Sequence, residues 1–110
     1  MDNEPTSSPS IATDTRTAFE EFRVAGTTNP KELAASIASN VRVGKRVCLV
    51  AIGHQAVSQA VKAVPILNSH MANKLILFCI LPSLEDRVIM EGKDAVTRTC
   101  TLLRLIPYSF

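Results

Sequence analysis

Residues 46–64 read RVCLVAIGHQAVSQAVKAV, and this stretch decides the fold. Its first part, residues 47–52, is a continuous apolar run, which is typical of a central strand covered on both faces. Gly53 closes that strand. Small apolar residues then recur at helical spacing until Pro65, which we expect to break or bend the helix. These residues are Val57, Ala60, Val61 and Val64. The stretch therefore predicts a buried strand followed by a helix with a narrow buried face.

The residues before this stretch predict a first strand and a first helix. Residues 18–26 alternate apolar and polar side chains, which indicates a short strand that ends at Gly26. Asn29 suits the N-cap of a helix, Pro30 the first helical position, and Glu32 the capping-box position. An apolar stripe follows, and Gly44 ends the helix. The stripe consists of Leu33, Ile37 and Val41.

The residues after Pro65 predict an antiparallel hairpin. Residues 75–81 form another apolar run, and residues 95–106 form a long strand rich in Thr, Val and Leu. The polar segment 82–94 between them indicates a mobile tip. The element order is then β-α-β-α-β-β, which belongs to the α/β class in its α+β sandwich form.

Length and composition favour one domain behind a tail. Residues 1–17 are rich in Ser, Thr, Pro and Asp, which predicts a disordered acidic tail. The 110 residues leave room for a single domain, residues 18–110. No apolar stretch is long enough for a membrane helix, and the N-terminus does not resemble a secretory signal. We therefore expect a cytoplasmic protein without a membrane partner, with the nucleoid or the nucleus as further locations.

The charges are distributed unevenly along the chain. Residues 1–21 hold five acids and one base, which leaves eleven bases and five acids in residues 22–110. This surplus of positive charge suits a polyanionic partner, although solubility alone also explains it. The sequence has no Trp and a single Tyr, so stacking of bases on an aromatic platform is not expected. Any binding of nucleic acid should depend on the phosphate backbone.

Residues that support catalysis are few. Cys48, Cys79 and Cys100 lie in predicted strands, so we interpret them as small buried residues. His54 and His70 have no ligands at metal spacing, and no dinucleotide or P-loop motif follows Gly53. We therefore expect neither a metal nor a cofactor, and a binding protein instead of an enzyme. His54 itself suits a phosphate contact, a titrating group or a plain polar helix start.

Several of these residues resemble one family. The segments are Val24-Ala25-Gly26, Asn29-Pro30, the small-residue helix 33–38 and, above all, residues 51–64. The last is similar to the pattern Ala-Ile-Gly-x-Gly-Ala-x-x-Gln-Ala-Val-Lys-Ala-Val of the stage V sporulation protein S family, which is related to the Alba chromatin proteins. The resemblance covers about residues 22–107.

The resemblance implies an Alba-like domain with two helices on one face of a four-stranded mixed sheet. It further implies a homodimer or higher homo-oligomer that binds DNA or RNA and regulates gene expression or development. The contacts would come from the loops before both helices and from the hairpin. Carried over by position, the nucleic-acid-binding residues are Lys31, His54, Gln55, Gln59, Lys62, Arg87 and Lys93. The alternative is an oligomerising protein-interaction or regulatory module that binds no nucleic acid.

Three positions depart from the family pattern. Gln55 replaces the second glycine, so a side chain occupies space that a phosphate would need. Pro65 replaces a small helix former, and the hairpin segment 82–94 is longer than in the bacterial family.

Overall fold

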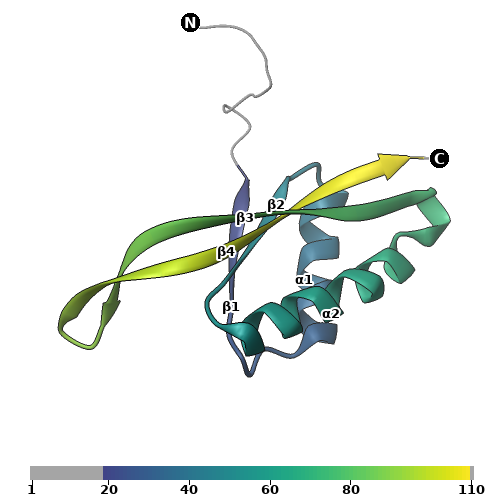
Figure 1. Cartoon of the computed structure of the whole chain (residues 1–110). Coiled ribbons are helices and arrows are strands. Elements are labelled where there is room, and N and C mark those ends of the chain that lie inside the picture. Colours follow the sequence, from purple (N-terminus) through teal and green to yellow (C-terminus); the bar gives the residue numbers. More distant parts are fainter. Residues whose placement is uncertain (1–18, 110) are drawn as a thin grey trace, which may run out of the picture.

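The computed structural model describes residues 19–109 (Figure 1), so the predicted tail of residues 1–17 lies outside the described part. The element order β-α-β-α-β-β is confirmed, with one short 3-10 helix added before the third strand. The elements are β1 (Glu20–Val24), α1 (Pro30–Arg42), β2 (Val47–Ala51), α2 (His54–His70), η1 (Ala72–Lys74), β3 (Ile76–Glu91) and β4 (Asp94–Ser109).

The four strands form one mixed sheet in the order β1-β2-β4-β3. β1 runs parallel to β2, as expected when a helix connects two strands, and β4 runs antiparallel to both β2 and β3. Both helices lie on the same side of the sheet (Figure 1), as the resemblance implied. The sheet therefore has one face that the helices cover and one face that carries no helix, which we call the open face.

β2 is the centre of the fold, and all five of its residues are buried, as the continuous apolar run predicts. Because successive side chains of a strand point to opposite faces, Val47, Leu49 and Ala51 pack in the main core under the helices. Cys48 and Val50 point to the open face. There they form a second cluster with Cys100 and Leu102.

The predicted start of α1 is confirmed. The side-chain oxygen of Asn29 accepts hydrogen bonds from the backbone N–H groups of Lys31 at 2.8 Å and Glu32 at 3.3 Å. Pro30 is the first helical residue, where its missing N–H costs nothing because that group has no partner inside the helix. Gly44 follows the helix with a φ of +85°, the left-handed conformation that glycine adopts without strain.

Two predictions about local structure need correction. Pro65 does not break its helix, because α2 continues to His70 and its buried face continues through Leu67. Packing of that face against the core outweighs the hydrogen bond that proline removes from the helix. Cys79 is exposed, whereas the other two thiols are buried as expected. It lies on β3, the edge strand of the sheet, and points to the open face, where no helix covers it.

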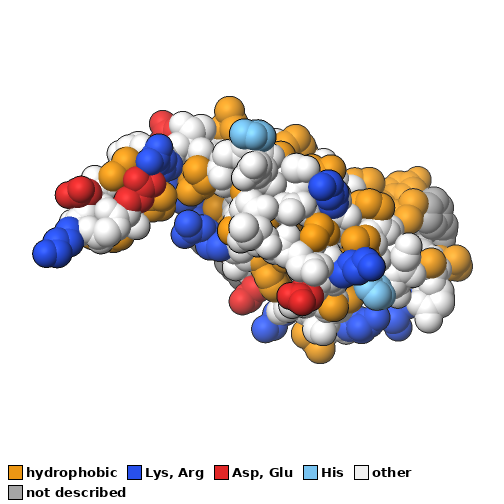
Figure 2. Space-filling model, turned by 90° about the horizontal axis from the view of Figure 1, so that it is seen from below, with side chains coloured by type: hydrophobic (Ala, Val, Ile, Leu, Met, Phe, Trp, Pro, Cys, Tyr) orange, Lys and Arg blue, Asp and Glu red, His pale blue; other side chains and the backbone are white. Residues whose placement is uncertain are grey.

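The hairpin is longer and more regular than the sequence indicated. β3 and β4 pair without interruption from Ile76 opposite Ser109 to Glu91 opposite Asp94. The segment 82–94 is therefore mostly strand, and the turn contains only two residues, Gly92 and Lys93. We call residues 84–101 the arm, since pairing between β2 and β4 stops at Thr101. The arm projects from one side of the body (Figures 1 and 2).

Candidate nucleic-acid interface

The start of α2 leaves its first backbone N–H groups without a side-chain cap. Gly53 precedes the helix with φ +88° and ψ 158°, a conformation essentially restricted to glycine, and no side chain of the described residues caps the helix. His54 is the first helical residue and is exposed. The free N–H groups and the helix dipole together favour a negatively charged ligand at such a start.

Three of the expected residues meet on one face of α2. Gln55, Gln59 and Lys62 are spaced by four and three residues, so they lie above one another along the helix. With Gly26 and Ser58 they line a hollow of about 240 Å³. The structure therefore brings the loop after β1 beside the first three turns of α2.

Gln59 ties that loop to the helix. Its amide nitrogen donates a hydrogen bond of 3.2 Å to the carbonyl oxygen of Gly26. Its amide oxygen is buried and has no hydrogen-bond partner among the described residues. A buried acceptor without a donor is costly, so a donor brought by a ligand or by water would stabilise this side chain.

Gln55 fills the space beside Gly26. A methyl group added to Gly26 would lie 3.0 Å from the amide oxygen of Gln55 and 3.1 Å from its Cβ. Both distances are shorter than ordinary carbon contacts. A β-carbon at position 26 would therefore require Gln55 to shift by a few tenths of an ångström, and the side chain of Gln55 forms one wall of the hollow.

Lys31 lies near a second hollow but does not line it. This hollow of about 400 Å³ adjoins the start of α1 and contains one charged side chain, the carboxylate of Glu32. Its lining consists of Phe22, Thr27, Thr28, Asn29, Glu32, Leu33 and Ser36. Lys31 is exposed in the first turn of α1, so a phosphate would meet it outside this hollow.

Arg87 does not lie at the hairpin tip, where the sequence placed it, and it is already paired. Its guanidinium donates two hydrogen bonds of 2.8 Å to the carboxylate of Glu21 on β1. A third bond of 2.8 Å joins its Nε to Glu85. These hydrogen bonds raise the pKa of Arg87 and lower that of Glu21. A phosphate would have to displace a carboxylate to reach this side chain.

Lys93 does occupy the tip. Gly92, with a φ of +66°, precedes it in the two-residue turn, where a type II′ hairpin turn requires glycine. Lys93 is exposed, and side chains of both charges surround the end of the arm (Figure 2). The tip lies far from both helices (Figure 1), so Lys93 and the hollow of α2 would contact separate parts of a ligand.

A model of stage V sporulation protein S matches residues 20–106. The chain belongs to the stage V sporulation protein S family. This membership implies a sporulation-related regulatory role. No curated protein matches the chain. The family assignment agrees with the segments 24–26 and 51–64, which surround the hollow of α2 in the structure.

Within this stage V sporulation protein S fold, the open face of the sheet carries arginines that are not among the site residues carried over from the resemblance. The guanidinium carbons of Arg46 and Arg104 lie 4.8 and 5.8 Å from the ring centroid of Phe19. Arg104 also donates a 2.9 Å hydrogen bond to the hydroxyl of Ser83. Alternation along β4 was the available signal, because Arg98 and Arg104 are six positions apart and therefore share one face.

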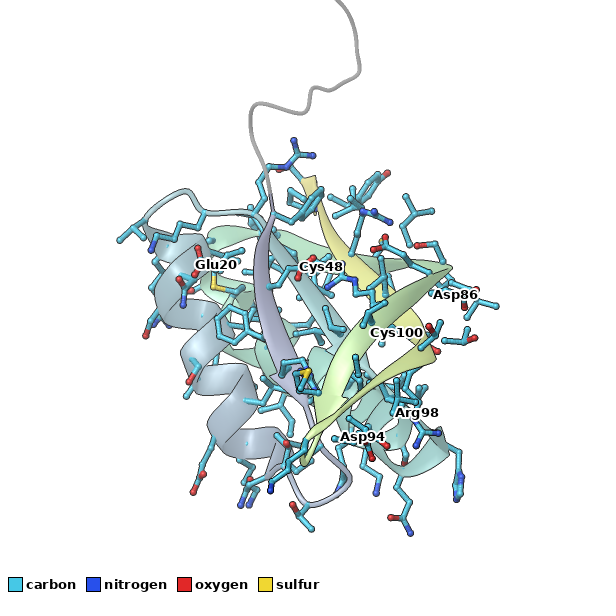
Figure 3. All side chains as sticks on the ribbon, turned by 90° about the vertical axis from the view of Figure 1, so that its left-hand side faces the viewer. Glu20, Cys48, Asp86, Asp94, Arg98 and Cys100 are labelled. Atoms are coloured by element: carbon cyan, nitrogen blue, oxygen red, sulfur yellow. The ribbon has the colours of Figure 1, made fainter. Side chains whose placement is uncertain are left out.

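Arg98 forms a bidentate ion pair on the arm. It donates two hydrogen bonds of 2.8 Å to the carboxylate of Glu91 on the paired strand. Figure 3 views the arm from its end and shows Arg98, Asp86 and Asp94 on it, with Cys48 behind them in the body of the sheet. The arginines of the arm thus stabilise the ribbon, and Lys93 is the basic residue at its tip.

Two further observations concern metal-ligating groups and membrane-spanning helices. No group of three or more metal-ligating side chains occurs within residues 19–109. None of the helices in this range is long and apolar enough to span a membrane.

Proposed function

We propose that the protein binds DNA or RNA, mainly through the phosphate backbone and with low sequence specificity, as a homodimer or higher homo-oligomer that regulates gene expression or development. The hollow on α2 carries this proposal. It is lined by Lys62 and by the amide side chains of Gln55 and Gln59, and it lies beside a helix start that has no side-chain cap. Lysine, amide and backbone N–H groups are the donors that proteins use on phosphate and sugar oxygens.

The charge and the aromatic residues support backbone contacts. Residues 22–110 hold eleven bases and five acids, so a phosphate chain gains from counterion release on binding. Phe78 is buried in the core, Phe22 packs against it, and Phe19 lies beneath two guanidinium groups. These three rings give bases no platform for stacking, and Tyr108, 59% exposed on β4, is a single ring, which favours low specificity.

The exposure and the partners of each side chain support some of these contacts more than others. Lys31, Lys62 and Lys93 are exposed at the start of α1, on α2 and at the arm tip, and His54 opens α2. Arg87 has the weakest claim to a phosphate contact, since Glu21 and Glu85 hold its guanidinium.

We further propose that the protein is not an enzyme and acts in the cytoplasm, on the nucleoid or in the nucleus. The thiols support the first point, because Cys48, Cys79 and Cys100 lie within strands. None is at a helix start, where the thiolate would be favoured. Burial moreover raises the pKa of Cys48, which opposes its use as a nucleophile.

The test is fluorescence anisotropy of labelled duplex DNA and single-stranded RNA across a salt series. We expect log affinity to fall linearly with log salt for the unmodified protein. The triple variant Lys31→Ala, Lys62→Ala, Lys93→Ala should bind more weakly, with a slope smaller by roughly one for each phosphate contact removed.

A matched control removes the same kind of charge elsewhere. Lys45→Ala with Lys74→Ala changes two exposed lysines, one after α1 and one in η1. This variant should keep most of the salt dependence if the named lysines make the contacts. Losses in proportion to the charges removed, three in the test variant and two in the control, would reduce the interaction to net charge. No binding at low salt would favour the interaction module.

A further inference from the structure

β3 is an edge strand, and half of its backbone groups point away from the sheet. In the order β1-β2-β4-β3 it has β4 on one side and no strand of the described chain on the other. In an antiparallel pair, residues that bond the partner strand alternate with residues whose N–H and C=O groups point away from it. Because β3 and β4 pair without interruption, one observation fixes which residues of β3 point outward.

Asn68 supplies that observation. Its side-chain amide donates a 3.3 Å hydrogen bond to the carbonyl oxygen of Phe78 and accepts a 2.8 Å bond from the Phe78 N–H. Both backbone groups of Phe78 therefore point away from β4, and so do those of every second residue along β3. Pro82 falls in this outward set, where its missing N–H costs no bond to β4. The turn agrees, since it bonds Glu91 to Asp94, and Glu91 lies in the other set.

On the arm, the outward set consists of Leu84, Asp86, Val88 and Met90. Their outward backbone groups bond nothing within residues 19–109. The side chains of Leu84, Val88 and Met90 are 72%, 69% and 66% exposed, whereas the residues opposite them on β4 are alanine and threonines. The large apolar side chains thus line the free edge itself. An unpaired edge of this kind is a template for a further strand.

The other edge of the sheet lacks these properties. β1 has 5 residues against the 16 of β3, and three of them are charged: Glu20, Glu21 and Arg23. Short length and charged side chains are the usual protection of an edge strand against pairing. The arm portion of β3 has no such protection in its outward set, apart from the single carboxylate of Asp86.

That carboxylate indicates the kind of occupant. A strand added beside β3 would place one side chain directly opposite each outward residue. Asp86, which accepts a 2.7 Å hydrogen bond from Thr99, would attract a lysine or arginine there and would repel a phosphate chain. The edge of a second β3 does not provide this base, because its own outward set contains none. That set is Ile76, Phe78, Ile80, Pro82, Leu84, Asp86, Val88 and Met90.

We propose that the arm binds an extended segment of another protein, which adds to the sheet beside β3. The segment runs antiparallel to β3, the more stable direction of pairing. It has apolar residues at alternate positions and a lysine or arginine opposite Asp86. Its backbone bonds the outward N–H and C=O groups, and its apolar side chains cover Leu84, Val88 and Met90. This surface is separate from the hollow on α2 and does not require nucleic acid.

Amide hydrogen exchange of the full chain, followed by NMR, tests the free edge first. In the protein alone, the outward N–H groups of the arm should exchange about tenfold faster than those of the residues between them, which bond β4. Slow exchange of the outward set would mean that another copy of the chain already covers the edge, and it would overturn the proposal.

The probe is the synthetic peptide Val-Thr-Val-Thr-Lys-Thr-Val. When its lysine faces Asp86, its valines face Met90, Val88 and Leu84. Adding the peptide should slow exchange of the outward amides and shift their NMR signals. A peptide with glutamate in place of lysine should bind roughly fivefold more weakly. Asp86→Lys protein should reverse this preference, and an unchanged preference would contradict the proposed register.

Two N-methylated peptides separate strand addition from apolar adhesion. The second valine directs its N–H toward β3, and the threonine after it directs its N–H away. Methylating the valine nitrogen should weaken binding roughly tenfold, and methylating the threonine nitrogen should change it little. Equal effects would overturn the proposal, and so would outward amides that no peptide perturbs. These readouts involve no nucleic acid, so an anisotropy failure would reject the proposed function alone.

Discussion

Arg87 and Glu21, 66 positions apart in the chain, form a bidentate ion pair with both hydrogen bonds at 2.8 Å. The pair fastens the arm to the edge strand β1 across the open face of the sheet. Glu85, on the same strand as Arg87, accepts a third hydrogen bond from it. The direction of the arm relative to the body is thus fixed by side chains as well as by the strands.

Removing this pair should loosen the arm. Glu21→Gln is expected to lower the free energy of unfolding by about 0.5–1 kcal/mol, a modest figure because both side chains are partly exposed and screened. Hydrogen exchange of residues 84–101 should also become faster. Urea denaturation and exchange mass spectrometry measure the two effects.

The matched control is Glu20→Gln, which neutralises the neighbouring residue on the same strand. Glu20 belongs to the other face of the sheet and does not contact Arg87. If both variants behaved alike, the ion pair would have no special part in fixing the arm.

The same pair predicts a dependence of stability on pH. Hydrogen bonds from Arg87 hold the pKa of Glu21 below its ordinary value of 4.5. A carboxylate with a lowered pKa stabilises the fold fully above the ordinary value, and this contribution is lost as the pH falls through the lowered pKa. The stability difference between the unmodified protein and Glu21→Gln should therefore be constant near neutral pH and shrink below about pH 4.5. Urea midpoints measured from pH 7 to pH 3 check this, and a difference that grew in acid would contradict it.

Pro65 should weaken the helix that contains it. Proline lacks the N–H that would bond the carbonyl of Val61, and Pro65 is exposed, so its ring adds little packing. Pro65→Ala is expected to raise the free energy of unfolding by about 1–3 kcal/mol. Urea denaturation measures the gain, with Ser69→Ala on the same helix as a control that should change little. A loss of stability in Pro65→Ala would show that the proline is needed for packing.

The contact between Gly26 and Gln55 can be tested by a double-mutant cycle. Gly26→Ala should destabilise the protein by about 1–2 kcal/mol, because the new methyl group meets Gln55 at 3.0 and 3.1 Å. In a Gln55→Gly background, which removes both contacting atoms, the same substitution should cost clearly less. Equal costs in both backgrounds would mean that position 26 requires glycine for another reason.

The thiols should differ in reactivity. Cys79 is exposed on β3, whereas Cys48 and Cys100 are buried on the inner strands. A thiol reagent such as DTNB should therefore modify one cysteine rapidly in the folded protein and all three in denaturant. Cys79→Ser should abolish the rapid phase, and a rapid phase that survived in this variant would contradict the assignment.

Local sequence signals predicted the central part of the fold well. The continuous apolar run of β2 indicated a strand buried on both faces, and Asn29-Pro30 indicated the start of α1. Both signals depend on short-range chemistry that tertiary structure did not override. Pro65 failed as a helix stop because the buried face of α2 continues beyond it, and propensity is weaker than packing.

The arm and the site were predicted less completely. The sequence predicted a mobile tip for segment 82–94. A projecting ribbon does not pack against a core, so its apolar and polar residues need not alternate strictly. The grouping of Gln55, Gln59 and Lys62 followed from helical spacing and the resemblance. The pairing of Arg87 with Glu21 could not be predicted from the sequence. It depends on how the hairpin bends over the sheet, and no local sequence pattern determines that bend.

The two-residue turn at Gly92 and Lys93 restricts how the length of the arm can vary. With so short a turn and no bulge, removing one residue from either strand would shift the pairing by one and exchange the two faces of that strand. Val88 and Met90 would then move to the side of Glu21. Insertions and deletions in this hairpin should therefore be tolerated in matched pairs, one residue from each strand, so that the arm changes length in steps that preserve its two sides.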